Sequence, residues 1–233
     1  MKISAIIPSA GKGIRFSNKI KKQYVLIKNK PLIIHTIERV LACKKIDELY
    51  LIVPPEDEDE VNKKILAPFD LKRKVKVFPG GKTRQESVYF GLLAIKSSDF
   101  VLIHDGVRPL VTPELVSLAL EKAMLTGGST PIISLKETLI ELDNKINFPN
   151  RERFRLVQTP QAFAYDLLLM AHKRAREDGI NATDDASLVV NFGGKISLFP
   201  GSYINIKVTT YEDLLIVNQL IDLENKYENR YRF

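Results

Sequence analysis

Small and basic residues cluster directly after the first apolar segment of the chain. The apolar residues Ile3 to Pro8 are followed by Ala10-Gly11-Lys12-Gly13, with Arg15 and Lys22 within the next few positions. Small residues let backbone N–H groups approach phosphate oxygens closely, and Lys12, Arg15 and Lys22 supply positive charge. This pattern predicts a site for an anion with several phosphates, such as a nucleoside triphosphate.

Two common glycine-rich motifs do not fit this chain. A dinucleotide-binding loop needs a small residue at the end of the pattern G-x-G-x-x-G, and Phe16 occupies that position. The run Gly80-Gly81-Lys82-Thr83 resembles the end of a Walker A loop, but Lys76 stands where its first glycine is required. A dinucleotide-dependent dehydrogenase and a P-loop ATPase are therefore disfavoured.

The composition predicts one soluble globular domain spanning residues 1–233. The chain is 45% hydrophobic and 27% charged, and neither a linker-like segment nor an internal repeat is visible. One cysteine, Cys43, and three scattered histidines predict neither a disulfide nor a cysteine and histidine metal site. No apolar segment reaches the ~20 residues of a membrane span, so we expect a cytoplasmic protein without a membrane partner.

The formal net charge of +7 is compatible with two kinds of anionic partner. Single-strand nucleic-acid binders place aromatic residues among their basic residues so that bases can stack. The densest basic run here, Lys72 to Lys74 with Lys76, instead leads into an apparent strand, which is typical of a charged sheet edge. A small anionic substrate is favoured over nucleic acid.

The elements that must position these residues alternate between strands and helices. Strands are expected at Ile3 to Pro8, Leu49 to Val53, Val75 to Phe78, Phe100 to His104 and Ile196 to Phe199. Helices are expected from Pro31, through Val61 and Leu66, after the caps Thr83 and Thr112, at Tyr165 to Arg176, and after Thr209 or Thr210. Repeated strand-helix units with continuous apolar strands predict an α/β fold with a mostly parallel sheet covered on both faces.

Three segments that follow predicted strands carry the candidate chemistry. Ligands of parallel sheets bind beyond the carboxyl ends of strands. This rule places the loops Ser9 to Arg15, Gly80 to Ser87 and His104 to Pro109 at one opening. The polar stretch from about Leu135 to Val157 breaks the alternation and is expected to leave the sheet, as an arm between subunits or as a lid in a monomer.

Seven motifs resemble one family when they are taken in order. They are Ala10-Gly11-x-Gly13-x-Arg15, Lys22-Gln23-Tyr24, Gly80-Gly81, His104-Asp105-Gly106-Val107-Arg108-Pro109, Thr159-Pro160-Gln161-Ala162-Phe163, Thr183-Asp184-Asp185-Ala186-Ser187 and Asn205-Ile206-Lys207-Val208-Thr209. From residue 3 to about 216 the chain resembles the 2-C-methyl-D-erythritol 4-phosphate cytidylyltransferase family. The resemblance implies a Rossmann-like twisted sheet of the sugar nucleotidyltransferase kind, and a protruding β-arm at about 135–157 that forms a homodimer.

The resemblance also implies a reaction and a set of site residues. The family joins CTP to a sugar-alcohol phosphate, methylerythritol phosphate, and releases pyrophosphate, a step of isoprenoid precursor synthesis. The implied catalytic residues are Arg15, Lys22 and Lys207. The implied nucleotide contacts are Ala10, Gly11, Lys12, Gly13, Gly81, Ser87, Asp105 and Gly106. The implied acceptor contacts are Arg108, Thr159 and Thr183, with Thr138 and Arg151 from the second subunit.

The implied cofactor is Mg²⁺ or another divalent cation. Ile204 occupies a position that is an aspartate in some family members. We therefore expect the ion to be held mainly by the CTP phosphates and water, with Asp105 nearby. Lys21 replaces a proline that is usual in the family, which is expected to loosen its loop.

Three other functions stay open from the sequence. A ribitol 5-phosphate cytidylyltransferase would share most of these motifs and differ in its acceptor pocket. A nucleotide-binding regulatory module would bind CTP without turnover, and the retained Arg15, Lys22 and Lys207 disfavour it. A nucleic-acid binder would need salt-sensitive affinity for oligonucleotides.

Overall fold

The computed structural model of the protein describes residues 1–11, 21–142 and 146–230. An eight-stranded sheet runs through its centre, with the strand order β10-β7-β11-β6-β1-β4-β5, and the eighth strand, β12, also pairs with β7. Its strands are β1 (Ile3–Pro8), β4 (Glu48–Val53), β5 (Val75–Pro79), β6 (Phe100–Ile103), β7 (Gly128–Ile133), β10 (Leu156–Val157), β11 (Gln161–Ala164) and β12 (Ser197–Pro200).

Most neighbouring strands are parallel. Strand β1 is parallel to β4 and β6, β4 to β5, and β12 to β7, whereas β11 and β10 run antiparallel to their neighbours. The predicted mostly parallel α/β sheet is therefore confirmed. Strands β7 and β11 were not predicted, and β11 places an antiparallel strand in the middle of the sheet.

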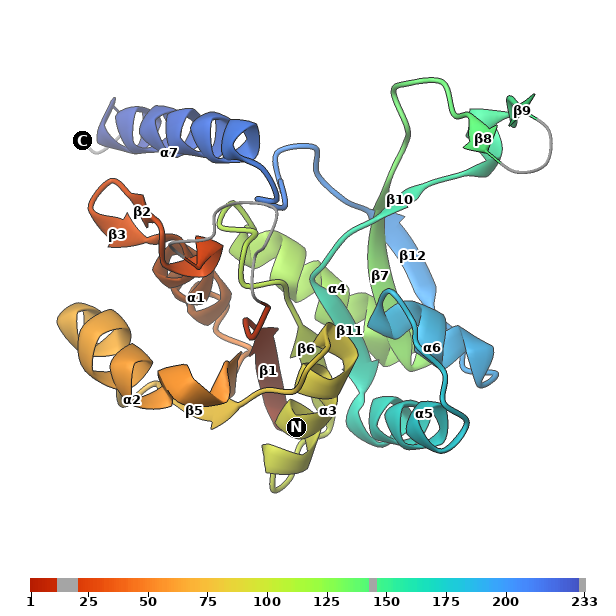
Figure 1. Ribbon diagram of the computed structural model, residues 1–233, viewed down its shortest axis with the longest axis horizontal. Helices are drawn as coiled ribbons and strands as arrows, with labels where there is room; N and C mark the ends of the chain where they lie inside the picture. The colour runs from red at the N-terminus through yellow and green to blue at the C-terminus, as the bar shows by residue number, and fades with distance from the viewer. Residues whose placement is uncertain (12–20, 143–145, 231–233) are drawn as a thin grey trace.

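Alternating side chains of the central strands are buried on both faces of the sheet. On β1, Ala5 and Ile7 pack against one hydrophobic cluster, while Ile6 packs against the other. The first cluster includes residues of α1 (Leu32–Ala42) and α4 (Pro113–Thr126), and the second includes residues of α3 (Arg84–Ala94), α5 (Tyr165–Glu177) and α6 (Asp185–Asn191). Helices thus cover both faces, as the apolar strands predict (Figure 1).

Helix starts agree with their sequence signals. The Thr83 side chain accepts a hydrogen bond from the Glu86 backbone N–H at the start of α3, and Thr112 accepts from Leu115 N–H at the start of α4. Asp213 accepts from the backbone N–H groups of Thr209 and Thr210 at the start of the last helix, α7 (Tyr211–Arg230). Caps of this kind satisfy N–H groups that lack a partner within the helix.

The segment through Val61 and Leu66 is helical but irregular. It consists of η2 (Pro55–Asp57), α2 (Glu58–Glu60), the π-helix η3 (Val61–Leu66) and η4 (Ala67–Phe69). Val61 and Leu66 are buried, so the predicted apolar face is present although the winding differs from an α-helix.

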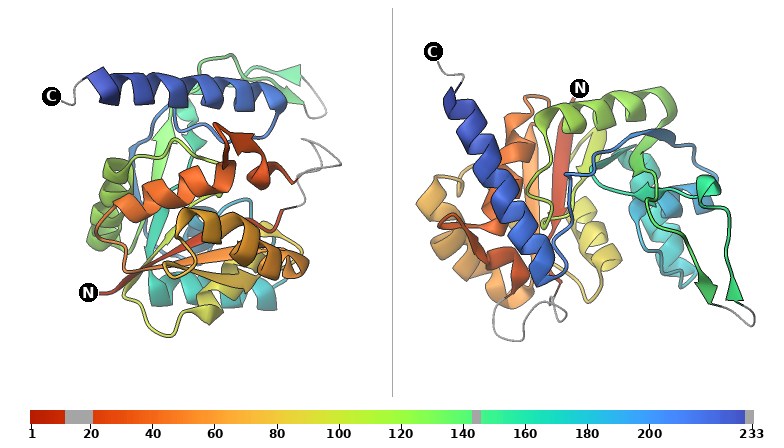
Figure 2. Two further views of the ribbon diagram at one scale, coloured as in Figure 1. Left: turned by 90° about the vertical axis from the view of Figure 1, so that its left-hand side faces the viewer. Right: turned by 90° about the horizontal axis from the view of Figure 1, so that it is seen from above.

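The segment from 135 to 157 leaves the sheet, as predicted. It contains the two-stranded β8 (Glu141–Leu142) and β9 (Ile146–Asn147) and the short helix η5 (Arg151–Arg153), and it returns to the sheet at β10. We call residues 135–157 the arm. The described part of the arm extends away from the body of the molecule in the right-hand view of Figure 2 and at the upper right of Figure 1.

The last helix covers a small hairpin near the amino terminus. Val217 and Ile221 of α7 pack with Ile27 of the hairpin β2 (Leu26–Ile27) and β3 (Lys30–Pro31). Lys28, which lies in the turn between β2 and β3, forms a 2.6 Å ion pair with Asp222 of α7. Among the described helices, none combines the length and hydrophobicity needed to cross a membrane.

Candidate active site

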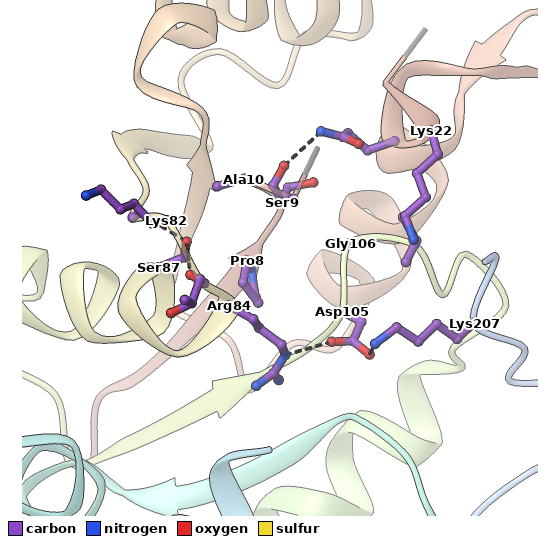
Figure 3. Close-up of a pocket in the computed structure, with 15 residues that line it drawn as sticks. Pro8, Ser9, Ala10, Lys22, Lys82, Arg84, Ser87, Asp105, Gly106 and Lys207 are labelled. Carbon is purple, nitrogen blue, oxygen red and sulfur yellow. Dashed lines mark hydrogen bonds and ion pairs between the residues drawn. The ribbon is translucent and has the colours of Figure 1, made fainter. Parts of the chain in front are cut away.

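One pocket lies at the carboxyl ends of β1, β5 and β6. It is lined by described residues of the three predicted loops together with Lys22 and Lys207. Figure 3 shows these two lysines on the side opposite Ser87 and Lys82. Each loop begins by continuing its strand, because Ser9 N–H donates to Ile52 O and Gly80 N–H donates to Val53 O. We call this the first pocket, and it confirms that the three loops share one opening.

Two glycines allow these loops to pack closely. A Cβ atom on Gly106 would lie 2.7 Å from Ile33 Cδ1 and 2.8 Å from Ser9 Oγ. A Cβ atom on Gly80 would lie 2.5 Å from the Ala10 Cβ. Since such contacts are too short, only glycine lets the three loops lie against one another here.

The Ser87 hydroxyl stabilises the loop from Gly80 to Ser87 through two hydrogen bonds. It accepts a hydrogen bond of 3.1 Å from Gly81 N–H and donates one of 2.9 Å to Thr83 O. The Ser87 side chain is buried at the edge of the first pocket. Its predicted contact with the cytosine ring stays a prediction.

Lys22 is held beside the pocket by its sequence neighbours. It begins η1 (Lys22–Tyr24), in which the Gln23 side chain donates to Ser9 O at 2.9 Å. Lys21 Nζ lies 2.7 Å from both carboxylate oxygens of Asp57, and the Tyr24 hydroxyl donates to the same carboxylate. This ion pair ties Lys21 to η2, and the expectation that Lys21 loosens the loop stays a prediction.

Four charged side chains form the floor of the site. Asp105 accepts from Arg84 Nε at 3.2 Å on one oxygen, and from Arg108 Nε at 3.2 Å and Lys207 Nζ at 3.0 Å on the other. Burial alone would raise the pKa of Asp105, but Arg84, Lys207 and Arg108 overcome this effect and hold the pKa well below its ordinary value. We call Arg84, Asp105, Arg108 and Lys207 the charged cluster.

A second pocket adjoins the first across the charged cluster. Arg84, Asp105 and Lys207 line both pockets, and the second is otherwise lined by Arg108 and by residues of the β10–β11 segment and of the start of α6. Those residues are Arg108, Val157, Gln158, Thr159, Gln161, Thr183, Asp184 and Ser187. Two molecules bound in these pockets would meet at the charged cluster.

The predicted site residues fall into four groups by position. The first pocket is lined by Ala10, Gly11, Lys22, Gly81, Ser87, Asp105, Gly106 and Lys207. The second is lined by Arg108, Thr159 and Thr183, as well as by Asp105 and Lys207. Thr138 and Arg151 lie exposed on the arm, and neither is among the described residues that line the two pockets. Lys12, Gly13 and Arg15 lie outside the described residues.

The structure adds Arg84 to the site. Arg84 directly follows the α3 cap, and it donates from Nε to Asp105 and from Nη1 to Asp185 at 2.8 Å. The sequence offered one signal for Arg84, which is its position in the predicted loop from Gly80 to Ser87. Its contact with Asp185, 101 positions away, could not be read from the sequence.

The cap of helix α6 is Asp184 rather than the neighbouring Thr183. Thr183 is exposed, whereas Asp184 accepts from Ser187 N–H at 2.9 Å and forms the cap. The other Asp184 oxygen accepts from the Gln161 side chain. Thr183 is thus placed at the pocket without a capping role.

His104 supports the loop beneath the charged cluster. Its Nδ1 accepts from the Thr159 hydroxyl at 3.0 Å, and its Nε2–H donates to Arg108 O at 3.2 Å. The same Thr159 oxygen accepts from Asp105 N–H. Burial lowers the pKa of His104 to about 4, so the ring is neutral at pH 7.

The buried His104 predicts a loss of stability in mild acid. The unfolded chain takes up a proton near pH 6.5, whereas the folded chain does so only near pH 4. The free energy of unfolding should therefore fall by on the order of 3 kcal/mol as the pH drops through this window. Urea unfolding of the wild type and His104→Gln at pH 7 and pH 4.5 measures this effect. An equal loss in both proteins would contradict the assignment to His104.

A dedicated metal cage is not formed by the described residues. They contain no group of three His, Cys, Asp or Glu side chains placed to hold an ion. Asp105 is the sole carboxylate among the residues described at the first pocket, and both of its oxygens accept from cations. These observations suit an ion that arrives already bound to phosphates.

The sheet, the glycine loops and the charged cluster define an α/β nucleotidyltransferase fold. A structure from Thermus thermophilus, described as 2-C-methyl-D-erythritol 4-phosphate cytidylyltransferase, is similar, with a TM-score of 0.79 and 32% identity, covering 94% of this chain and 98% of that one. The 4-diphosphocytidyl-2C-methyl-D-erythritol synthase of Anaerococcus prevotii gives a TM-score of 0.82 and 30% identity, with 95% and 96% covered.

The chain belongs to the 2-C-methyl-D-erythritol 4-phosphate cytidylyltransferase (IspD) family, whose profile matches residues 3–222. A family member from Clostridium botulinum (strain Eklund 17B / Type B) is 41% identical over 94% of this chain and 99% of its own length. A member from Desulforamulus reducens is 38% identical, covering 96% and 97%. The predicted family and nucleotidyltransferase class are confirmed.

Proposed function

We propose that this protein transfers the cytidylyl group of CTP to the phosphate of 2-C-methyl-D-erythritol 4-phosphate. The products are 4-diphosphocytidyl-2-C-methyl-D-erythritol and pyrophosphate, in non-mevalonate isoprenoid precursor biosynthesis. Membership of the family supports this assignment. The observation that carries it within the structure is the pair of pockets that meet at the charged cluster.

The reaction needs two anions to approach each other. An oxygen of the acceptor phosphate forms a bond to the α-phosphorus of CTP, and the bond from that phosphorus to the bridging oxygen of pyrophosphate breaks. The attacking phosphate is already ionised, so no protein base is needed, and catalysis rests on positioning and on positive charge. Lys207 lines both pockets and Lys22 lines the first, which supports their assignment with Arg15 as the catalytic cations.

The first pocket is assigned to CTP. Backbone groups of Ala10, Gly11 and Gly81 line this pocket and are assigned to the cytosine base. The hydrogen bond from Gly81 N–H to Ser87 Oγ holds Gly81 in position. Asp105 and Gly106 are assigned to the ribose. Lys12 and Gly13 complete the proposed nucleotide contacts.

The second pocket is assigned to the sugar-alcohol phosphate. Arg108 supplies positive charge for its phosphate, and Thr159, Thr183 and neighbouring polar side chains suit its hydroxyl groups. Arg108 is fixed by Asp105 and by its bond to Asn205 O at 2.8 Å. A preformed cation of this kind loses little entropy when it binds a phosphate.

The proposed assembly is a homodimer built through the arm. Leu142, Ile146 and Phe148 on the arm are 79%, 69% and 65% exposed, which is typical of a surface that another chain covers. A second subunit would bring Thr138 and Arg151 to the acceptor pocket. Sedimentation equilibrium tests this assembly, and a monomer at micromolar concentration would contradict it.

The proposed cofactor is Mg²⁺ bound to the CTP phosphates, with Asp105 as the nearest carboxylate. Bound there, the ion would neutralise charge on the triphosphate. We further propose that residues 1–233 form a single catalytic domain that acts in the cytoplasm, without a nucleic-acid or membrane partner. The single cysteine, Cys43, is buried and supports a reducing compartment.

A comparison of two acceptors tests the proposed function. The purified protein is given CTP and Mg²⁺ with either methylerythritol 4-phosphate or ribitol 5-phosphate, and pyrophosphate release is measured. We expect a higher kcat/KM with methylerythritol 4-phosphate. A higher value with ribitol 5-phosphate would keep the reaction and change the substrate, and CTP binding without release would indicate a regulatory module.

A further inference from the structure

A buried chain of hydrogen bonds leads from helix α5 to the charged cluster. His172 Nε2 lies 3.0 Å from Asp185 Oδ1, and Asp185 Oδ2 accepts from Arg84 Nη1 at 2.8 Å. Arg84 Nε then donates to Asp105 at 3.2 Å. We call His172, Asp185 and Arg84 the relay, since it connects α5, α6 and α3 to the point where the two pockets meet.

The relay is almost closed to solvent. The side chains of His172 and Asp185 are 0% and 1% exposed, while that of Arg84 is 26% exposed at the pockets. Water therefore cannot replace a lost partner of Asp185 without a rearrangement. Burial alone would raise the pKa of Asp185, but Arg84 and His172 overcome this effect and lower it.

Asp185 and Arg84 each divide their polar atoms between two partners. The two oxygens of Asp185 are divided between His172 and Arg84, and the guanidinium of Arg84 is divided between Asp185 and Asp105. If His172 did not occupy Oδ1, that oxygen would be available to a second N–H of Arg84. Bidentate pairing with Asp185 would then compete with the Arg84 contact to Asp105.

Packing alone does not explain a histidine at position 172. Its ring stacks on Tyr89 with centroids 6.3 Å apart, but its Nδ1 is buried without a hydrogen-bond partner in the described structure. An apolar side chain would avoid the cost of that unpaired nitrogen. Histidine differs from an apolar side chain here because its Nε2–H donates a hydrogen bond to Asp185.

We propose that His172 is a positioning residue for cytidylyl transfer, acting through Asp185 to hold Arg84 and the charged cluster in place. The inference rests on the proposed function of the site. His172 and Asp185 do not touch either substrate in this account, and Arg84 is the residue through which they act.

The test compares two replacements of His172 with a matched control. His172→Phe keeps a ring and removes the donor, whereas His172→Gln keeps an N–H near the position of Nε2. The control is Tyr165→Phe, which removes another α5 hydrogen bond, 2.9 Å long, from Tyr165 to Leu92 O on α3 but leaves the relay intact. Pyrophosphate release gives kcat and KM, and thermal unfolding reports stability.

We expect His172→Phe to lower kcat by about 10- to 100-fold, because small displacements at a reacting centre have effects of this size. The KM for CTP should change little, since neither His172 nor Asp185 is among the described residues that line the first pocket. His172→Gln should recover most of the lost kcat. Tyr165→Phe should lower the melting temperature with little change in kcat.

A double-mutant cycle separates positioning from general destabilisation. If His172 acts through Arg84, combining His172→Phe with Arg84→Lys should lower kcat no further than Arg84→Lys alone. Multiplied effects in the double variant would contradict the proposal, as would wild-type kcat in His172→Phe or failure of His172→Gln to recover activity while folded. Should His172→Phe not fold, Asp185→Asn carries the same expected loss.

The same assays distinguish this inference from the proposed function. If the wild type releases pyrophosphate and His172→Phe does so equally well, the relay proposal fails alone. If the wild type is folded but releases none with either acceptor, the proposed function fails, and the relay proposal fails with it.

Discussion

Replacement of Lys207 by alanine is expected to lower kcat by about 10²- to 10³-fold while the protein remains folded. Lys207 Nζ lies 3.0 Å from Asp105 at the junction of the two pockets, where negative charge accumulates as the two phosphates react. Asp105 keeps Arg84 and Arg108 as hydrogen-bond partners when Lys207 is removed, so the protein should remain folded. Steady-state pyrophosphate release and thermal unfolding measure the two effects.

Lys45 offers a matched control for this variant. Like Lys207, it is 40% exposed and paired with a carboxylate, here Glu121 at 2.6 Å, and it is not among the residues described at either pocket. Lys45→Ala should therefore retain wild-type kcat. Near-normal turnover by Lys207→Ala would refute the catalytic assignment of Lys207. Lys22→Ala is also expected to lower kcat, because Lys22 lines the first pocket, to which the triphosphate is assigned.

Arg84→Met should produce the largest loss of stability among these variants. The substitution removes a cation shared by two buried carboxylates, Asp105 and Asp185, and leaves each with fewer partners. Breaking a buried ion pair from one side costs about 3–5 kcal/mol. Urea unfolding at pH 7 measures this loss, and kcat should also fall because the charged cluster is altered.

A second substitution tests whether the cost comes from unpaired charge. Asp185→Asn removes one of the two buried negative charges, so Arg84→Met with Asp185→Asn should be less destabilised than the sum of the single variants predicts. Additive losses would show that the Arg84 effect is one of packing. Wild-type stability in Arg84→Met would contradict the buried ion-pair account itself.

Local signals in the sequence predicted much of the fold. The apolar runs of β1, β4, β5 and β6 needed no tertiary information to recognise, and β1, β4 and β6 are buried on both faces. Thr83 and Thr112 act locally, through hydrogen bonds to residues three positions ahead, and so the caps were predictable. The rule that ligands bind at strand carboxyl ends then placed three loops together.

Other features depend on contacts between distant residues. Strand β11 is four residues long, and its antiparallel pairing with β6 and β7 is set by the return of the chain from the arm. The relay joins residues 84, 172 and 185 from three helices, and no local pattern marks their contact. Family motifs identified Asp105 and Lys207, whereas their ion pair could be seen only in three dimensions.

The most direct test of the account is to follow the phosphorus atoms of the reaction by ³¹P NMR. CTP, Mg²⁺ and the protein are observed with and without methylerythritol 4-phosphate. A new diphosphate ester and pyrophosphate should form in equal amounts, and only when both substrates are present. Conversion of CTP to CMP without the acceptor, or an unchanged spectrum with both substrates and folded protein, would contradict transfer between the two pockets.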